Sequence, residues 1–101
     1  IEGLGYSDTA LYYAIRNLEE ARAYLADPVL GGRLREISEA LLQLDTDDPT
    51  QVFGYPDDLK LKSSMTLLEK AGEGTSDAEV FGKVLEKYFH GQRDHHTLER
   101  I

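Results

Sequence analysis

The sequence predicts an all-α fold, a single domain over residues 1–101 that forms an irregular bundle of five or six short-to-medium helices. Three observations support this prediction. Apolar residues recur at spacings of three and four along most of the chain, as they do on one face of a helix. Asn, Asp, Ser and Pro stand where these stretches begin. No stretch alternates apolar and polar residues in the way that a half-buried β-strand does.

The first two predicted helices are short. Ser7 is placed to accept a hydrogen bond from the first turn of a helix over residues 8–15. Asn17 and Glu20 have the spacing of a capping box, in which both side chains accept hydrogen bonds from free backbone N–H groups. A second helix is therefore predicted from this box to residue 26.

The third predicted helix, over residues 28–44, has the clearest amphipathic pattern in the chain. It begins at Asp27-Pro28, an N-cap followed by a proline in the first helical position. Its apolar stripe consists of Leu30, Leu34, Ile37, Leu41 and Leu44. Gly31-Gly32 weakens its first turns by about 1 kcal/mol per glycine relative to alanine. The sequence leaves open whether these glycines permit close packing or mark a break.

The second half of the chain predicts one short helical turn and two longer helices. Asp48-Pro49 starts the turn, which ends at Gly54. A helix starts in the run 55–58 and stops at Gly72. Residues 76–79 form a second capping box, which opens a helix that Gly91 closes. Asp94 is placed to cap a last turn through Leu98 to Ile101.

The chain is acidic, with 19 Asp and Glu residues against 11 Lys and Arg residues and a formal net charge of −8. Phosphate groups meet a repulsive field around such a protein, so we expect neither nucleic acid nor an anionic membrane as a partner. No apolar run approaches the ~20 residues that span a bilayer. Cys is absent, which excludes a thiolate nucleophile and Cys-ligated zinc and is compatible with the cytoplasm, the predicted location.

The least acidic stretch of the chain, residues 54–72, is also its richest in hydroxyl groups. Lys60 and Ser64 lie four residues apart and share one face of the predicted helix, where they are placed to hold an anion together. The full predicted ligand-binding set is Lys60, Ser64, Ser63, Thr66, Asp58 and Arg33. A packing explanation stays open, because small residues let another helix approach and their hydroxyls bond to the preceding turn.

No catalytic residue, metal site or cofactor is assigned from the sequence. The spacing of His90, His95 and His96 does not place two histidines on one helical face. Both serines of the hydroxyl-rich stretch follow its lysines, so the Ser-x-x-Lys motif of acyl enzymes is absent there. No glycine-rich phosphate loop accompanies Arg33 and Arg35.

The chain carries short motifs in a characteristic order. They are Ala14-Ile15, Glu20-Ala21, Tyr24-Leu25, Pro28-x-Leu30-Gly31-x-Arg33-Leu34, Phe53-Gly54, Asp58-x-Lys60-Leu61-x-Ser63-Ser64-Met65-Thr66-Leu67, Phe89-x-Gly91, Asp94 and Thr97-Leu98. With these motifs the chain resembles the DUF1810 family over nearly its whole length. The resemblance implies a small, mainly helical, cytoplasmic bacterial protein without an established activity.

Two departures from the family's pattern bear on these expectations. Family members carry an upstream segment rich in Trp, Phe and His, whereas this chain begins at Ile1 and has no Trp. The sequence therefore leaves open whether the chain is a fragment that lacks part of its core and of its site. Leu68 stands where the family has an aromatic residue, which we interpret as a change in packing.

Three functions remain open from the sequence. The leading hypothesis is a non-catalytic helical module that binds a small polar or anionic molecule, or a protein partner, through Lys60 and Ser64. The alternative is an enzyme acting on a phosphorylated or nucleotide-like metabolite, whose site the upstream segment completes. In this enzyme Lys60 stabilises developing negative charge, and Asp58 positions a proton acceptor or orients the lysine. The third is self-association into a homo-oligomer through apolar surface.

Overall fold

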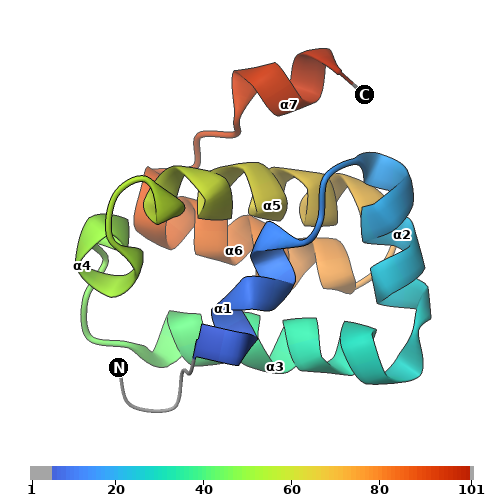
Figure 1. Ribbon diagram of the computed structural model, residues 1–101, viewed down its shortest axis with the longest axis horizontal. Coiled ribbons are helices and arrows are strands. Elements are labelled where there is room, and N and C mark those ends of the chain that lie inside the picture. Colours follow the sequence, from blue (N-terminus) through green and yellow to red (C-terminus); the bar gives the residue numbers. More distant parts are fainter. Residues whose placement is uncertain (1–5, 101) are drawn as a thin grey trace.

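The computed structural model describes residues 6–100, and the side chains of residues 10–100, and confirms the all-α prediction. Its seven helices in these residues are α1 (Tyr6–Tyr13), α2 (Leu18–Ala26), α3 (Pro28–Gln43), α4 (Pro49–Phe53), α5 (Asp57–Ala71), α6 (Asp77–Phe89) and α7 (His95–Glu99). The number exceeds the predicted five or six because the turns near Pro49 and His95 each form a five-residue helix. In Figure 1, α5 and α6 lie side by side between α3 and α7.

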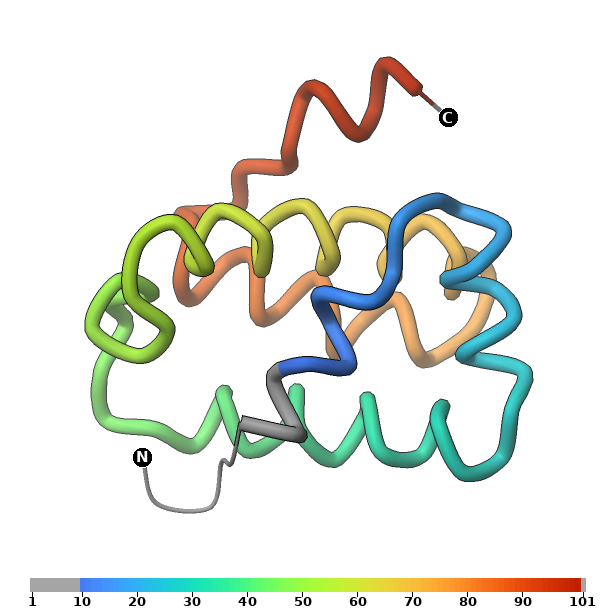
Figure 2. The backbone as a smooth tube through the Cα atoms, in the orientation of Figure 1, coloured from blue at the N-terminus to red at the C-terminus, as the bar shows by residue number. Residues whose placement is uncertain are grey.

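Helix α5 is the centre of the fold. It packs against α1, α2, α4, α6 and α7, and Figure 2 shows α1 crossing between α3 and α5. Its residues 64–68 are all buried. The core around it consists of Tyr12, Ile15, Ala21, Leu34, Ile37, Leu41, Leu61, Met65, Leu67, Leu68, Phe81, Val84, Leu85 and Tyr88. No helix within residues 6–100 combines the length and apolar character needed to cross a membrane.

Four helices begin at the predicted caps, including α7, where the carboxylate of Asp94 accepts a hydrogen bond from the backbone N–H of Thr97 at 3.1 Å. The side chain of Asn17 accepts a hydrogen bond from the backbone N–H of Glu20 at 2.8 Å. Asp27 caps α3 through the N–H groups of Val29 and Leu30, at 2.9 and 3.0 Å. Asp48 likewise accepts from the first turn of α4. Each cap satisfies donors that the helix itself leaves unpaired, so the start of the helix is determined within a few residues.

Other local predictions are wrong in detail. Helix α1 starts at residue 6 rather than 8, which places Ser7 inside it, and the side chain of Ser7 lies outside the described side chains. The Glu20 carboxylate accepts from the backbone of Arg16, not of Asn17. The predicted last turn after Asp94 forms as α7, but this helix ends at Glu99, and Ile101 lies outside the described residues.

The capping box at residues 76–79 does not form. The backbone of Ser76 is already helical, with φ −66° and ψ −17°, and its side chain makes no cap hydrogen bond. A capping side chain needs an extended backbone in order to reach the following N–H groups. The hydroxyl of Thr75 accepts from the backbone N–H of Asp77 in its place, at 3.2 Å.

The glycines of α3 permit close packing and do not break the helix, which runs without interruption from Pro28 to Gln43. A Cβ atom on Gly31 would lie 2.7 Å from the carbonyl oxygen of Leu25 and 3.2 Å from that of Tyr24. A Cβ atom on Gly32 would meet nothing within 4 Å. Only Gly31 is therefore required for the close approach of α3 to the end of α2.

The last carbonyl groups of α3 are satisfied by a side chain of α6. The ammonium group of Lys87 donates to the carbonyl oxygens of Leu41, Leu42 and Leu44, at 2.9, 3.0 and 2.5 Å. The hydroxyl of Tyr88 also donates to Leu41, at 2.6 Å, and burial raises the pKa of this phenol. These bonds replace the intrahelical donors that a helix C-terminus lacks, and they hold α3 against α6.

Candidate functional site

The predicted pair Lys60 and Ser64 does not face a shared open surface. Ser64 is buried and donates a hydrogen bond to the carbonyl oxygen of Tyr12 in α1, at 2.7 Å. The ammonium group of Lys60 is exposed, 3.6 Å from the carboxylate of Asp57 and 5.7 Å from the ring centroid of Tyr13. The hydroxyl of Ser64 thus links α5 to α1, and Lys60 lies outside the core.

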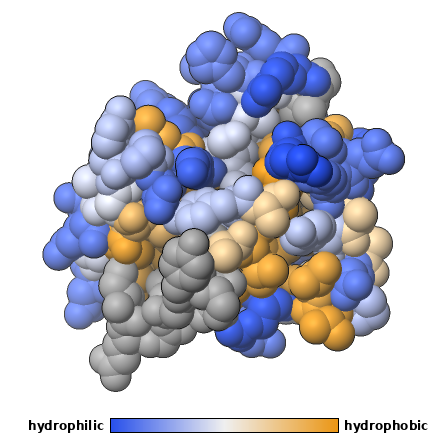
Figure 3. Space-filling model, in the orientation of Figure 1, coloured by the Kyte–Doolittle hydropathy of each residue, from blue (hydrophilic) through white to orange (hydrophobic). Residues whose placement is uncertain are grey.

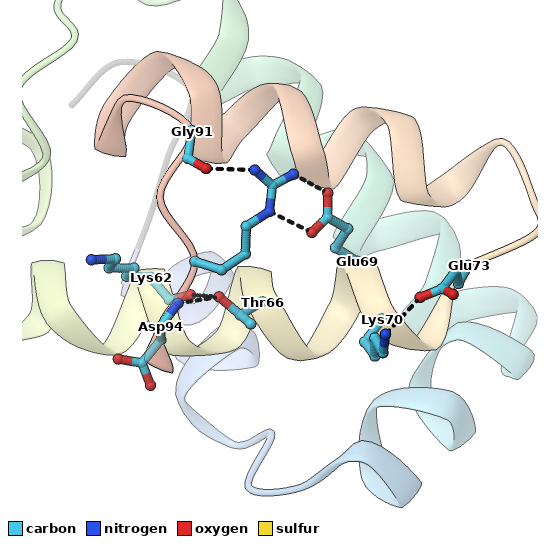
Figure 4. Close-up of polar contacts among 8 residues, drawn as sticks. Lys62, Thr66, Glu69, Lys70, Glu73, Gly91 and Asp94 are labelled. Atoms are coloured by element: carbon cyan, nitrogen blue, oxygen red, sulfur yellow. Dashed lines mark hydrogen bonds and ion pairs between the residues drawn. The ribbon is translucent and has the colours of Figure 1, made fainter. Parts of the chain in front are cut away.

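Two further hydroxyls of α5 hold the C-terminal helix. Thr97 donates its hydroxyl proton to the carboxylate of Asp94 at 2.5 Å, so its oxygen accepts from Ser63, at 2.8 Å. The hydroxyl of Thr66 accepts from the backbone N–H of Asp94 at 3.0 Å, as Figure 4 shows, and donates to the carbonyl of Lys62 at 2.8 Å. Ser63 and Thr66 therefore attach α7 and the segment before it to α5.

The remaining two predicted residues have separate surroundings. Asp58 is 8% exposed and accepts from the hydroxyl of Thr50 in α4 at 2.7 Å. Arg33 is exposed on α3 and donates to Glu36 at 3.3 Å. The six predicted residues thus do not meet in one pocket, because five of them lie around α5 and contact different neighbours.

A pocket of about 230 Å³ lies beside these hydroxyls. It is lined by Arg16 and Asn17 at the α1–α2 corner (residues 14–17), Leu67 of α5, and Thr97 and Arg100 at α7. We call it the Arg16–Arg100 pocket. Figure 3 shows hydrophilic surface on α7, at the top, and on the right of the molecule, with paler and apolar atoms between them. The lining of the pocket thus includes one apolar residue, Leu67, and two basic residues, Arg16 and Arg100.

The two arginines of this pocket differ in their partners. The guanidinium of Arg16 donates to the carboxylate of Glu20, with Nη2 3.0 Å and Nε 3.4 Å from the oxygens. This hydrogen bonding raises the pKa of Arg16 and lowers the pKa of Glu20, so both groups stay charged. The guanidinium of Arg100 has no hydrogen-bond or ion-pair partner within the part of the chain that the structure describes.

A second pocket, of about 340 Å³, lies between α3 and α6, but its basic groups already have partners. Arg35 donates to both carboxylate oxygens of Asp77, at 2.6 and 2.9 Å, and this hydrogen bonding lowers the pKa of Asp77. Lys83 lies 3.4 Å from Glu79. Across the described residues no three His, Cys, Asp or Glu side chains gather in a way that could hold a metal ion.

The segment between α6 and α7 is fixed in place, which sets the position of Arg100. Arg93 forms a two-point ion pair with Glu69 of α5 and donates to the carbonyl of Gly91 (Figure 4). A Cβ atom on Gly82 would lie 2.7 Å from the Glu69 carboxylate, so the glycine leaves room for this pair on α6.

Sequence reasoning missed all five residues that line the Arg16–Arg100 pocket. They come from residues 16–17, 67 and 97–100, which are far apart in the chain. No local spacing connects these positions. The sequence patterns do include Asn17, as a helix cap, and Leu67 and Thr97, in the family motifs, but none of these patterns indicates a ligand site. Ser63 of the hydroxyl-rich stretch bonds to the pocket residue Thr97.

Comparisons with known proteins give a family but no activity. The model of the family described as "Protein of unknown function (DUF1810)" matches residues 1–101. The crystal structure of the conserved hypothetical protein Rv1873 from Mycobacterium tuberculosis is similar, with a TM-score of 0.77 and 42% sequence identity. The similarity covers 100% of this chain and 70% of that one. No curated protein matches the sequence.

Proposed function

The chain belongs to the DUF1810 family of proteins of unknown function, and on that premise we propose that it is a binding module for a small anionic molecule. The ligand would occupy the Arg16–Arg100 pocket, with its charged group on Arg100. Arg16 and Asn17 would approach it from the α1–α2 corner and Leu67 from α5.

The observation that carries this proposal is the unpartnered guanidinium of Arg100 at the rim of a pocket. The chain has 19 acidic residues for 11 basic ones, so carboxylates are abundant, yet none pairs with Arg100 within residues 6–100. A guanidinium offers five N–H donors in a planar fork, which suits carboxylate and phosphate groups. Among the described side chains, Nη1 of Arg16 has no acceptor and the amide N–H groups of Asn17 have none either, since only the amide oxygen of Asn17 is used, by the N–H of Glu20.

Two observations favour this pocket over the alternatives. The larger pocket between α3 and α6 has its cations neutralised by Asp77 and Glu79. The hydroxyl of Ser64 is already donated to Tyr12, and the exposed ammonium group of Lys60 lies 3.6 Å from the carboxylate of Asp57. An exposed lysine that is already paired attracts further anions weakly, because water screens it and its partner offsets its charge.

The experiment is a titration with small carboxylates and phosphates, followed by thermal unfolding and calorimetry. A ligand at 100 times its Kd stabilises the native state by about 2.7 kcal/mol. We expect Arg100→Ala to abolish the shift. Arg22→Ala, which removes the same charge from an exposed position on α2, should keep it.

Lys60→Ala separates this proposal from the ligand site predicted from the sequence. It should leave the shift unchanged if the ligand binds at Arg100. A shift that survives Arg100→Ala but disappears with Lys60→Ala would move the site to the exposed face of α5. No shift with any anion, in a chain that unfolds cooperatively, would refute anion binding.

A further inference from the structure

We infer that the ligand is a small organic monocarboxylate with an apolar body, rather than a dianion such as inorganic phosphate. This inference rests on the proposed function and specifies the class of molecule that the Arg16–Arg100 pocket selects. Three properties of the pocket support it: its charge, its apolar wall and its size.

The charge of the pocket favours a single negative charge on the ligand. Arg16 is neutralised by Glu20, whose carboxylate lies 3.0 Å from Nη2 of the guanidinium. Arg100 is then the one cation at the rim whose charge is not compensated by a described residue. A second negative charge on the ligand would find no free cation and would meet the repulsive field of a chain with net charge −8.

The apolar wall favours a ligand with a hydrocarbon body. Leu67 lines the pocket from α5 and is 4% exposed, so its side chain is part of the core and cannot move away. Only the small exposed part of Leu67 faces the pocket, and inorganic phosphate would leave that part in contact with water. A methylene group that covers it should tighten binding by up to about fourfold, the factor that corresponds to full burial of one CH₂ group.

The volume of the pocket bears on the size of the ligand's hydrocarbon body. Its volume of about 230 Å³ is below the roughly 300–1,000 Å³ of pockets that hold drug-sized molecules. The pocket therefore suits a carboxylate with a body of a few carbon atoms, with its head on Arg100 and the amide of Asn17 as a further donor.

The test compares acetate, butyrate, hexanoate and inorganic phosphate by calorimetry at constant ionic strength. We expect affinity to rise with each methylene from acetate, by up to about fourfold per group, until the pocket is full. Phosphate should bind at least tenfold more weakly than butyrate. Butyramide, which has the same body without the charge, should not bind measurably.

The outcomes separate the two proposals. Arg100-dependent binding of phosphate that is tighter than that of every carboxylate would overturn the monocarboxylate inference and leave anion binding intact. Carboxylates that bind with no gain per methylene would also overturn it. Absence of binding by all four anions would refute the proposed function itself, and this inference with it.

A charge substitution tests the argument without altering the core. Glu20→Gln releases the guanidinium of Arg16 and keeps a side-chain oxygen to accept from the Arg16 backbone, so the rim gains one free cation. The ratio of phosphate to butyrate affinity should rise at least threefold in this variant. Glu19→Gln removes the same charge from an exposed neighbouring position and should leave the ratio unchanged. Equal ratios in the two variants would contradict the charge argument.

Discussion

Replacing each of the two adjacent glycines of α3 by alanine should change stability in opposite directions. In Gly31→Ala the new methyl group would lie 2.7 Å from the carbonyl oxygen of Leu25 and 3.2 Å from that of Tyr24. Both oxygens belong to the backbone and cannot rotate away. Such overpacking costs about 1–3 kcal/mol, while alanine gains up to about 1 kcal/mol in helix propensity. The clash involves backbone, so we expect a net loss of about 1–2 kcal/mol.

The neighbouring position provides a matched control. A methyl group on Gly32 meets nothing within 4 Å, so Gly32→Ala should gain about 0.5–1 kcal/mol from helix propensity alone. The two variants should then differ by about 2 kcal/mol in urea unfolding followed by circular dichroism. For a chain of this size that difference corresponds to a Tm difference of about 8–16 °C. Equal stabilisation by both substitutions would show that α2 and α3 move apart to accommodate the methyl group at no cost, and it would refute the steric argument.

Two further predictions concern charged side chains: the ammonium group of Lys87 and the ion pair of Arg35 with Asp77. Lys87→Met removes the donor to three carbonyl groups at the end of α3 and should lower the free energy of unfolding in urea by about 2–3 kcal/mol. The control Lys83→Met, on the exposed face of α6, should lower it by less than about 0.5 kcal/mol. Equal losses in the two variants would contradict the capping role of Lys87. Hydrogen bonding to Arg35 lowers the pKa of Asp77 in the folded chain below its ordinary value of 3.8. The pair therefore contributes its full stabilisation of the fold above pH 3.8, and this stabilisation is lost as the pH falls through the lower pKa of the folded chain. Melting curves between about pH 6 and pH 2 should therefore fall more steeply for the wild type than for Asp77→Asn, and parallel profiles would refute the linkage.

The helix starts that could be predicted are those whose determinants lie within a few residues. Asn17, Asp27 and Asp48 each cap the helix that follows, and their partners are two or three positions away. The prediction of a capping box at Ser76 was wrong, because the backbone of Ser76 is helical and Thr75 accepts from the N–H of Asp77. The carboxylate of Asp77 pairs with Arg35, 42 positions earlier, and a pattern of four residues contains no information on such a distant partner.

The candidate site could be predicted only in part, for the same physical reason. The sequence identifies the hydroxyl-rich stretch of α5 as unusual, and each of its hydroxyls does have a specific partner. Ser64 bonds to Tyr12, 52 positions away, and Ser63 bonds to Thr97, 34 positions away. One sequence cannot distinguish a hydroxyl that meets a ligand from one that meets a neighbouring helix. The ligand-binding role of Lys60 stays a prediction.

The enclosure of α5 has a consequence for how the chain unfolds. Residues 64–68 are buried on every side by helices from both ends of the sequence. Serine and threonine are modest helix formers, and isolated helices of about 15 residues are marginal in water, so this segment is stable only when its neighbours surround it. We therefore expect the amide hydrogens of residues 64–68 to exchange with solvent through global, cooperative unfolding.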